Sequence, residues 1–200
     1  MELTFIQRRL TSDEINALPL VHYEGPLSVV RSAKHLDEVL PALRAEPILG
    51  FDTETRPTFR KGSVHLPSLM QLATADHVYL IQLDMVPLDV LCGELMTNPA
   101  QIKAGVAIGE DMRTLGLRFP FTPQGHVDLG TIAEKHNIYS RGLRSLVASF
   151  FGERISKGPQ CSNWGVSRLS QRQIIYAATD AWMGRRLYMR MLELGLAEAL

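Results

Sequence analysis

The chain has 200 residues, of which 46% are hydrophobic and 21% are charged, with 21 basic and 21 acidic side chains and a formal net charge of zero. This length predicts one domain with a sizeable buried core, because domains usually contain about 100–200 residues. The composition excludes disordered, collagen-like and coiled-coil chains, and no apolar run approaches the ~20 residues that cross a bilayer.

The first half of the chain alternates short apolar runs with helical patterns, which is typical of α/β layers. Residues 1–25 are predicted to form an N-terminal arm, and residues 26–200 the domain itself. The arm becomes charged too early to be a signal peptide, so we expect a soluble, cytoplasmic protein. The first elements of the domain are predicted to be strands at 27–30, 48–53, 69–74 and 78–83, with helices after Ser32 and at 87–96.

The second half of the chain predicts a strand at 102–108 and three helices. The first helix begins near Gly109, the second spans 127–135 and the third spans 143–151. A long polar loop, 152–166, separates them from the last helix. Ser170 and Gln173 have the spacing of a capping box, which predicts that the last helix begins there. Neither a linker nor an internal repeat divides the chain.

The charged side chains are unevenly distributed along the chain. Residues 1–140 carry 12 basic against 17 acidic side chains, whereas residues 141–200 carry 9 against 4. A polyanion would therefore meet one basic region, although a solvated helical surface explains the pattern equally well. The two cysteines form no CxxC pair, the six histidines lack HExxH spacing, and neither a GxxxxGK[ST] nor a GxGxxG loop occurs in the sequence. Zinc chemistry and the usual phosphate-binding loops are therefore not expected.

Two acids lie at the end of the predicted strand 48–53, Asp52 within it and Glu54 just after it, in the sequence FDTET. Alternate residues of a strand project to the same side, about 7 Å apart, so the two carboxylates repel each other unless a cation lies between them. Oxygen ligands of this kind suit Mg²⁺ or Mn²⁺ better than zinc. For an isolated pair, acids that point into solvent are the more common explanation.

Three further residues could contribute to the same chemistry. Tyr176 and Asp180 are four residues apart in YAATD, so they lie on one face of the last predicted helix, beside small residues that would let a backbone or a substrate approach. On its own, such a pair is most often a partly buried hydrogen bond. Asp111 follows a predicted strand and opens a helix, where the helix dipole favours an acid with or without a function.

Taken together, these motifs resemble the DEDDy 3′–5′ exonucleases, the family of ribonuclease D, the Werner-syndrome exonuclease domain and the proofreading domains of DNA polymerases. The resemblance covers about residues 27–195, and no position of the family's metal site departs from the pattern. It extends beyond the acids to four segments: LPSLMQLAT, VDLGTIAEK, GLRSLVASFFG and SNWGVSRLSQRQIIYAATDAW.

The resemblance implies an RNase H-like α/β fold, with a mixed, mainly parallel sheet flanked by helices. It implies that Asp52 bridges two divalent cations, Mg²⁺ or Mn²⁺, which Glu54, Asp111 and Asp180 also bind. Tyr176 is implied to orient the attacking water. The implied reaction hydrolyses the terminal phosphodiester bond of DNA or RNA and releases nucleoside 5′-monophosphates.

Other side chains are expected to contact the substrate, because cations bind phosphates and an aromatic ring can stack on a base. These substrate-binding candidates are Thr55, Arg56, Lys61 and Leu69 near the first motif, and Arg154, Lys157, Asn163 and Trp164 in the polar loop. Core packing is the more common role for Trp164, and a structural role is equally common for Thr55 and Leu69. The expected partner is a single-stranded or otherwise 3′-ended nucleic acid, which a homo-oligomer would bind more tightly by repeating the basic surface.

Two other functions compete with this prediction. A catalytically silent nucleic-acid-binding module on the same fold should lose metal ligands, because clustered acids without a cation are costly, yet every ligand is present here. An RNase H-type endonuclease also clusters acids, but the pairing of Tyr176 with Asp180 near the carboxyl end argues against it. The helical domains that follow in ribonuclease D are absent from this sequence. Substrate choice is therefore expected to come from the domain itself, from residues 1–25 or from a partner chain.

Overall fold

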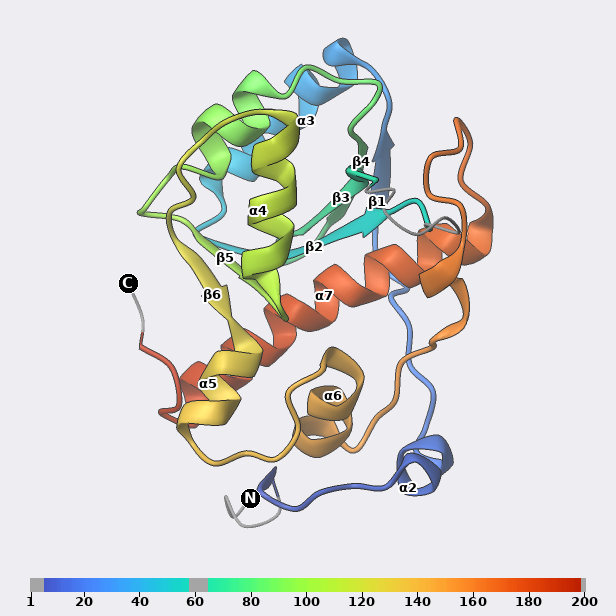
Figure 1. Cartoon of the computed structure of the whole chain (residues 1–200), viewed down its shortest axis with the longest axis vertical. Coiled ribbons are helices and arrows are strands. Elements are labelled where there is room, and N and C mark those ends of the chain that lie inside the picture. Colours follow the sequence, from blue (N-terminus) through green and yellow to red (C-terminus); the bar gives the residue numbers. More distant parts are fainter. Residues whose placement is uncertain (1–5, 58–64, 199–200) are drawn as a thin grey trace.

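The structure is a computed structural model that describes residues 6–57 and 65–198. Figure 1 shows a central sheet crossed by one long helix, with shorter helices above and below it. The elements, in chain order, are α2 Ser12–Ala17, β1 Leu27–Val30, α3 Ala33–Ala45, β2 Ile48–Thr55, β3 Pro67–Ala73, β4 Val78–Gln82, a π-helical stretch Leu91–Leu95, β5 Ile102–Gly105, α4 Ile108–Arg118, β6 His126–Asp128, α5 Leu129–Lys135, α6 Leu143–Phe151, a 3-10 turn Gly158–Cys161 and α7 Gln171–Glu193.

Six strands form one sheet in the order β1-β4-β3-β2-β5-β6. The pairs β1–β4, β2–β5 and β5–β6 are parallel, whereas β3 runs antiparallel to both of its neighbours, β2 and β4. The predicted architecture, a mixed and mainly parallel sheet flanked by helices, is therefore confirmed. Because β2, β5 and β6 run in the same direction, their carboxyl ends lie at the same edge of the sheet.

Alternation along the strands divides the core between the two faces of the sheet. Leu49 and Phe51 of β2 pack with apolar residues of α3 and α4 on one face. On the other face, α7 contacts β2, β3, β4 and β5, as Figure 1 shows. The outer side of α7 packs on α6, where Leu146 and Phe150 join Leu187 in a second cluster. Within the described part of the chain, every helix falls short of the length and apolarity needed to span a membrane.

Two glycines let α7 lie directly on the strands. A Cβ at Gly50 of β2 would overlap the carbonyl oxygen of Ala181, and one at Gly184 would come within 2.9 Å of the carbonyl oxygen of Ala104. Arg185 strengthens this contact, because its Nε donates to the carbonyl of Ile48 at 2.9 Å. The helix therefore brings its own side chains close to the polar end of β2.

The predicted elements agree with the structure except at three places. The strand expected at 102–108 ends at Gly105, because Ala107 adopts a left-handed conformation (φ 58°) and α4 then begins at Ile108. The helix expected at 127–135 begins with a strand instead, since β6 pairs with β5 before Asp128 caps α5. The segment expected to be a helix at 87–96 contains a π-helical stretch. The capping box of Ser170 and Gln173 begins the last helix as predicted.

Candidate active site

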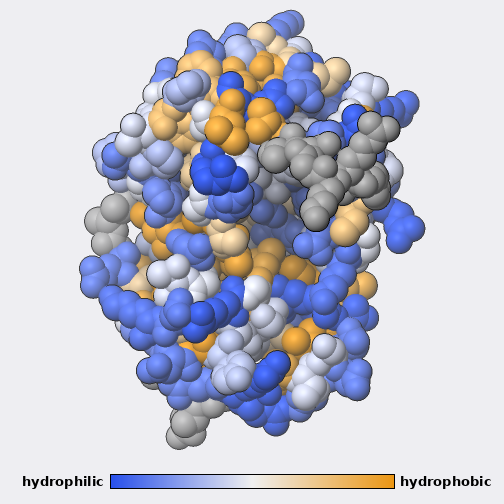
Figure 2. All heavy atoms as spheres, viewed as in Figure 1, coloured by the Kyte–Doolittle hydropathy of each residue, from blue (hydrophilic) through white to orange (hydrophobic). Residues whose placement is uncertain are grey.

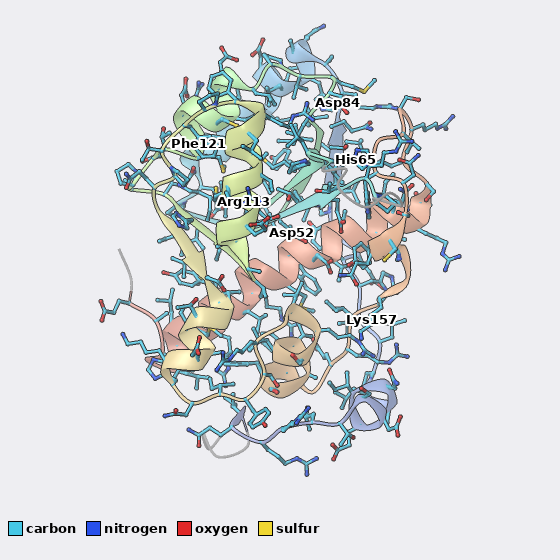
Figure 3. All side chains as sticks on the ribbon, viewed as in Figure 1. Asp52, His65, Asp84, Arg113, Phe121 and Lys157 are labelled. Atoms are coloured by element: carbon cyan, nitrogen blue, oxygen red, sulfur yellow. The ribbon has the colours of Figure 1, made fainter. Side chains whose placement is uncertain are left out.

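Three carboxylates converge where α7 crosses the end of β2. Asp52 and Glu54 project from the same face of β2 as Gly50, toward α7, and Asp180 comes from α7 itself. One oxygen atom from each carboxylate lies within 4.8 Å of the others. Figure 3 shows Asp52 where β2, the beginning of α4 and α7 come together. The sequence prediction that these three acids meet therefore agrees with the geometry.

This group of carboxylates holds its protons tightly in the absence of a cation. Burial, followed by the charges of Asp180 and Asp111, raises the pKa of Asp52 well above its usual range. Burial and the Asp52 charge raise the pKa of Glu54 to about 10, and burial raises the pKa of Asp180 to about 7. Like charges confined to a poorly hydrated space cannot all ionise without compensation.

The donor set fits a hard divalent cation. All three groups offer carboxylate oxygens, the ligands that Mg²⁺ and Mn²⁺ prefer. The buried Oδ1 of Asp180 has no hydrogen-bond partner among the described residues, although buried polar atoms are normally paired. A cation would satisfy this oxygen and neutralise the group.

Asp111 lies beside the three carboxylates rather than among them. Its Oδ1 accepts a hydrogen bond from the Thr53 hydroxyl, on the residue between the two acids of β2. Burial raises the pKa of Asp111 to about 6, which the Thr53 hydrogen bond partly opposes. Its charge in turn contributes to the raised pKa values of Asp52 and Glu54. The fourth acid of the sequence prediction is therefore next to the group, held by Thr53.

Tyr176 lies one turn before Asp180 on α7 and is only 9% exposed. Burial, and then the charges of Asp180 and Glu54, raise the pKa of its hydroxyl far above the usual range. The phenol therefore stays neutral at any pH near 7 and can act only as a hydrogen-bonding group. Its ring packs against that of Trp164, with the ring centroids 6.0 Å apart.

A cavity of about 600 Å³ opens onto these groups. Asp52, Glu54, Asp180 and Tyr176 line it, together with residues of α2, α6 and the loop 155–160. Two basic side chains, Arg144 of α6 and Lys157 of the loop, are part of this lining. Figure 3 shows Lys157 on the loop below α7. Figure 2 shows hydrophobic residues near the middle of this face with hydrophilic residues around them.

Two of the predicted substrate contacts, Leu69 and Trp164, have side chains that lie in the core, the alternative role weighed for both. Leu69 is fully buried and Trp164 is 1% exposed, and both pack in the cluster beneath α7 that also contains Tyr176. The indole Nε1 of Trp164 donates to the carbonyl of Gln160 at 3.4 Å. Trp164 therefore supports the ring of Tyr176 rather than offering a face for a base.

The remaining candidates occupy different places. Lys157 lines the cavity, whereas Arg154 lies outside its lining and its Nε donates to the carbonyl of Leu18 at 2.9 Å. Arg56 and Asn163 are exposed outside the cavity lining, and Thr55 is partly exposed at the irregular end of β2. Lys61, the remaining predicted substrate contact, lies outside the described residues.

Sequence reasoning missed several residues at the site. Ser12 and Ile15 of α2, with Arg144 of α6, line the cavity, and the contacts that place them there are between distant parts of the chain. Gln71 of β3 lies directly opposite Asp52 in the sheet register and is fully buried, yet its amide atoms lack hydrogen-bond partners within the described structure. A polar residue in the apolar run LMQLA was the one signal for it.

Comparison with known proteins agrees with this site. A sequence model of the 3′–5′ exonuclease family matches residues 27–195. A ribonuclease D of Granulibacter bethesdensis is 33% identical over 169 residues, which are 80% of this chain and 41% of that protein. The human exonuclease mut-7 homolog is 29% identical over 170 residues, 70% of this chain and 19% of that protein. The chain thus spans well under half the length of these relatives.

Solved structures show the same fold. The Aedes aegypti Nibbler EXO domain superposes with a TM-score of 0.77 at 23% identity, covering 89% of this chain and 94% of that one. Escherichia coli RNase D gives a TM-score of 0.73 at 24% identity and covers 84% of this chain and 46% of that one. These are RNase H-like exonuclease domains, so the fold class inferred from the motifs is confirmed. With the family match extending over residues 27–195, the chain belongs to the 3′–5′ exonuclease family.

Proposed function

We propose that this chain removes nucleotides from the 3′ end of a nucleic acid by hydrolysing the terminal phosphodiester bond, with two divalent cations, Mg²⁺ or Mn²⁺, as cofactors. The convergence of three carboxylates, with one buried oxygen of Asp180 unpaired in the described structure, is the observation that carries the proposal. A silent binding module would have no use for this arrangement, because clustered like charges destabilise the fold.

The residues divide the work by their chemistry. Asp52, Glu54 and Asp180 would hold the cations, and Asp111, released from Thr53, would complete the ligand set. When bound, two such cations activate the attacking water and stabilise the leaving oxygen in an in-line displacement. Tyr176, kept neutral by its raised pKa, would orient the water by hydrogen bonding rather than by removing a proton.

The substrate we propose is a single-stranded 3′ end of DNA or RNA. Arg144 and Lys157 in the cavity lining would bind the phosphates that precede the scissile bond, since such contacts are the main source of affinity for nucleic acids. A structure of Trypanosoma brucei RNase D, which shares this fold at 19% identity, is described as a complex with RNA. We further propose that the protein acts in the cytoplasm and that a homo-oligomer would repeat the basic surface.

The test uses DNA and RNA oligonucleotides labelled at the 5′ end. Each is incubated with the protein in Mg²⁺, Mn²⁺ or EDTA, and the products are resolved on a gel. We expect a ladder that shortens from the 3′ end only when a divalent cation is present. Intact substrate in every metal, together with a measurable gel shift, would replace the enzyme with a binding module.

A further inference from the structure

The cavity at the carboxylates has a wall that comes from the N-terminal segment. Ser12 and Ile15 of α2 line the same cavity as Asp52, Glu54 and Asp180. Ile15 is buried, although it belongs to a helix of only six residues. In Figure 1, α2 lies below the loop that leads into α7, on the side of α7 away from the sheet.

Hydrogen bonds fasten this segment to three separate elements. The Nη2 of Arg144, on α6, donates to Asn16 Oδ1 at 2.5 Å. Arg154 is bound twice, because its Nε donates to the carbonyl of Leu18 at 2.9 Å and its backbone N–H donates to the carbonyl of Pro19 at 2.8 Å. The backbone N–H of Tyr23 donates to Thr179 Oγ1 of α7 at 3.0 Å. The segment is therefore part of the packed structure beside the site.

These contacts also hold one basic side chain of the cavity, Arg144, in place. Arg144 lines the cavity while its guanidinium bonds both Asn16 and, through Nε at 3.3 Å, the carbonyl of Ile155. Ile15 and Ile155 supply an apolar surface next to it. The wall thus combines a cation, suited to a phosphate, with apolar side chains, suited to a sugar or a base.

The match to the exonuclease family begins at residue 27, after this segment. We infer that α2 and the residues that follow it, 12–23, are a specificity element of this site: they narrow the cavity so that one unpaired 3′ strand reaches the carboxylates while a paired end is excluded. The inference rests on the proposed function. A cavity of about 600 Å³ is in the size range of small-molecule sites, so the terminal nucleotide of a duplex must leave its partner strand to enter.

The decisive comparison is Ser12→Trp against Asp13→Trp. Both positions are exposed and adjacent on α2, but only Ser12 lines the cavity. We expect Ser12→Trp to weaken binding of a fluorescent single-stranded oligonucleotide at least tenfold, measured by anisotropy in EDTA, and to lower kcat/KM for cleavage by a similar factor. Asp13→Trp should behave like the unmodified protein. Equal behaviour of the two variants would overturn the inference.

A second variant widens the cavity instead of filling it. Ile15→Ala should raise cleavage of a blunt duplex relative to the same strand alone by at least threefold, whether the shorter side chain widens the cavity or loosens α2. An unchanged ratio would count against the wall as a filter for paired ends. If the unmodified protein binds single strands but cleaves nothing, the proposed reaction fails while the anisotropy comparison still decides the inference. If it binds no strand at all, both fail.

Discussion

Charged groups are buried at both ends of the sheet, but in opposite circumstances. Near the beginning of β5, Lys103 is fully buried, and its Nζ donates to the carbonyls of Asn98 and Gln101, both at 2.8 Å. At the end of β2, three carboxylates face one another and an oxygen of Asp180 is unpaired among the described atoms. A buried charge with its partners present serves the fold. Buried carboxylates that face one another instead suit the binding of a cation.

The largest expected effect comes from the end of the sheet that holds Asp52, Glu54 and Asp180, which we call the acid end. Asp52→Asn keeps the shape of the side chain but removes one of the proposed cation ligands, so cleavage should fall by several orders of magnitude. The metal-free variant should fold at least as stably as the unmodified protein, because one of the repelling charges is gone. Rates from the 3′-end assay and thermal melting in EDTA measure the two effects. Near-normal turnover would refute the two-cation assignment.

The acid end should also dominate how stability depends on pH when metal is removed. Because the pKa of Asp180 is raised to about 7, the native state keeps a proton that the unfolded chain releases near pH 4, so stability falls as pH rises between these values. Between pH 5 and 8 in EDTA we expect Tm to drop by about 5–10 °C. Mn²⁺ should restore most of this loss, and more strongly at pH 8. A Tm that is flat with pH would contradict the raised pKa values.

At the opposite end of the sheet, which holds Lys103 and which we call the lysine end, a substitution should lower stability but leave cleavage unchanged. Lys103→Met removes the donor of the buried Gln101 carbonyl and leaves the Asn98 carbonyl with only a long hydrogen bond from the Gln101 N–H at 3.5 Å, which should lower the free energy of unfolding by about 1–3 kcal/mol. Cleavage per folded molecule should be unchanged, since Lys103 is not part of the cavity lining. Denaturant unfolding beside the 3′-end assay at low temperature provides both numbers. A selective loss of activity would show that the two ends of the sheet are not independent.

Tyr176→Phe sharpens the comparison within the acid end. It removes a hydroxyl but no proposed metal ligand, so we expect cleavage to slow about tenfold, roughly what one hydrogen bond contributes, with unchanged Mn²⁺ affinity by calorimetry. Tyr176→Leu is the matched variant that also disturbs packing against Trp164. If the Phe variant lost as much activity as Asp52→Asn, the role of Tyr176 would need to be more than orientation.

The smallest effect concerns the turn that places Asp111. Ala107 has a φ of 58° and precedes α4, a conformation that costs a non-glycine residue about 1–2 kcal/mol. Ala107→Gly relieves this strain but frees the unfolded chain, so we expect a net gain in unfolding free energy of about 0.5–1 kcal/mol. Cleavage should be unchanged. A loss of stability on denaturant unfolding would mean that the methyl group of Ala107 makes contacts that outweigh the strain.

The sequence predicted the parts of this molecule that depend on local pattern. Alternating and helical periodicities located the strands and most helices, and the motifs that contain Asp52, Glu54 and Asp180 named acids that the structure brings together. What it missed depends on contacts between distant residues. The strand β6 exists because it pairs with β5, and Arg154 binds the carbonyl of Leu18. In both cases the two partners are too far apart in the sequence for a local pattern to reveal the contact.

Gly50 also bears on how the site comes into being during folding. Because this position has no side chain, the backbone of α7 at Ala181 rests against β2, and this contact carries Asp180 to the acids of the strand. The acids come from residues far apart in the chain, so the group of three carboxylates cannot form until the last helix has docked. Cation affinity would then report the final step of assembly, and a cation added early would favour chains in which that helix is already in place.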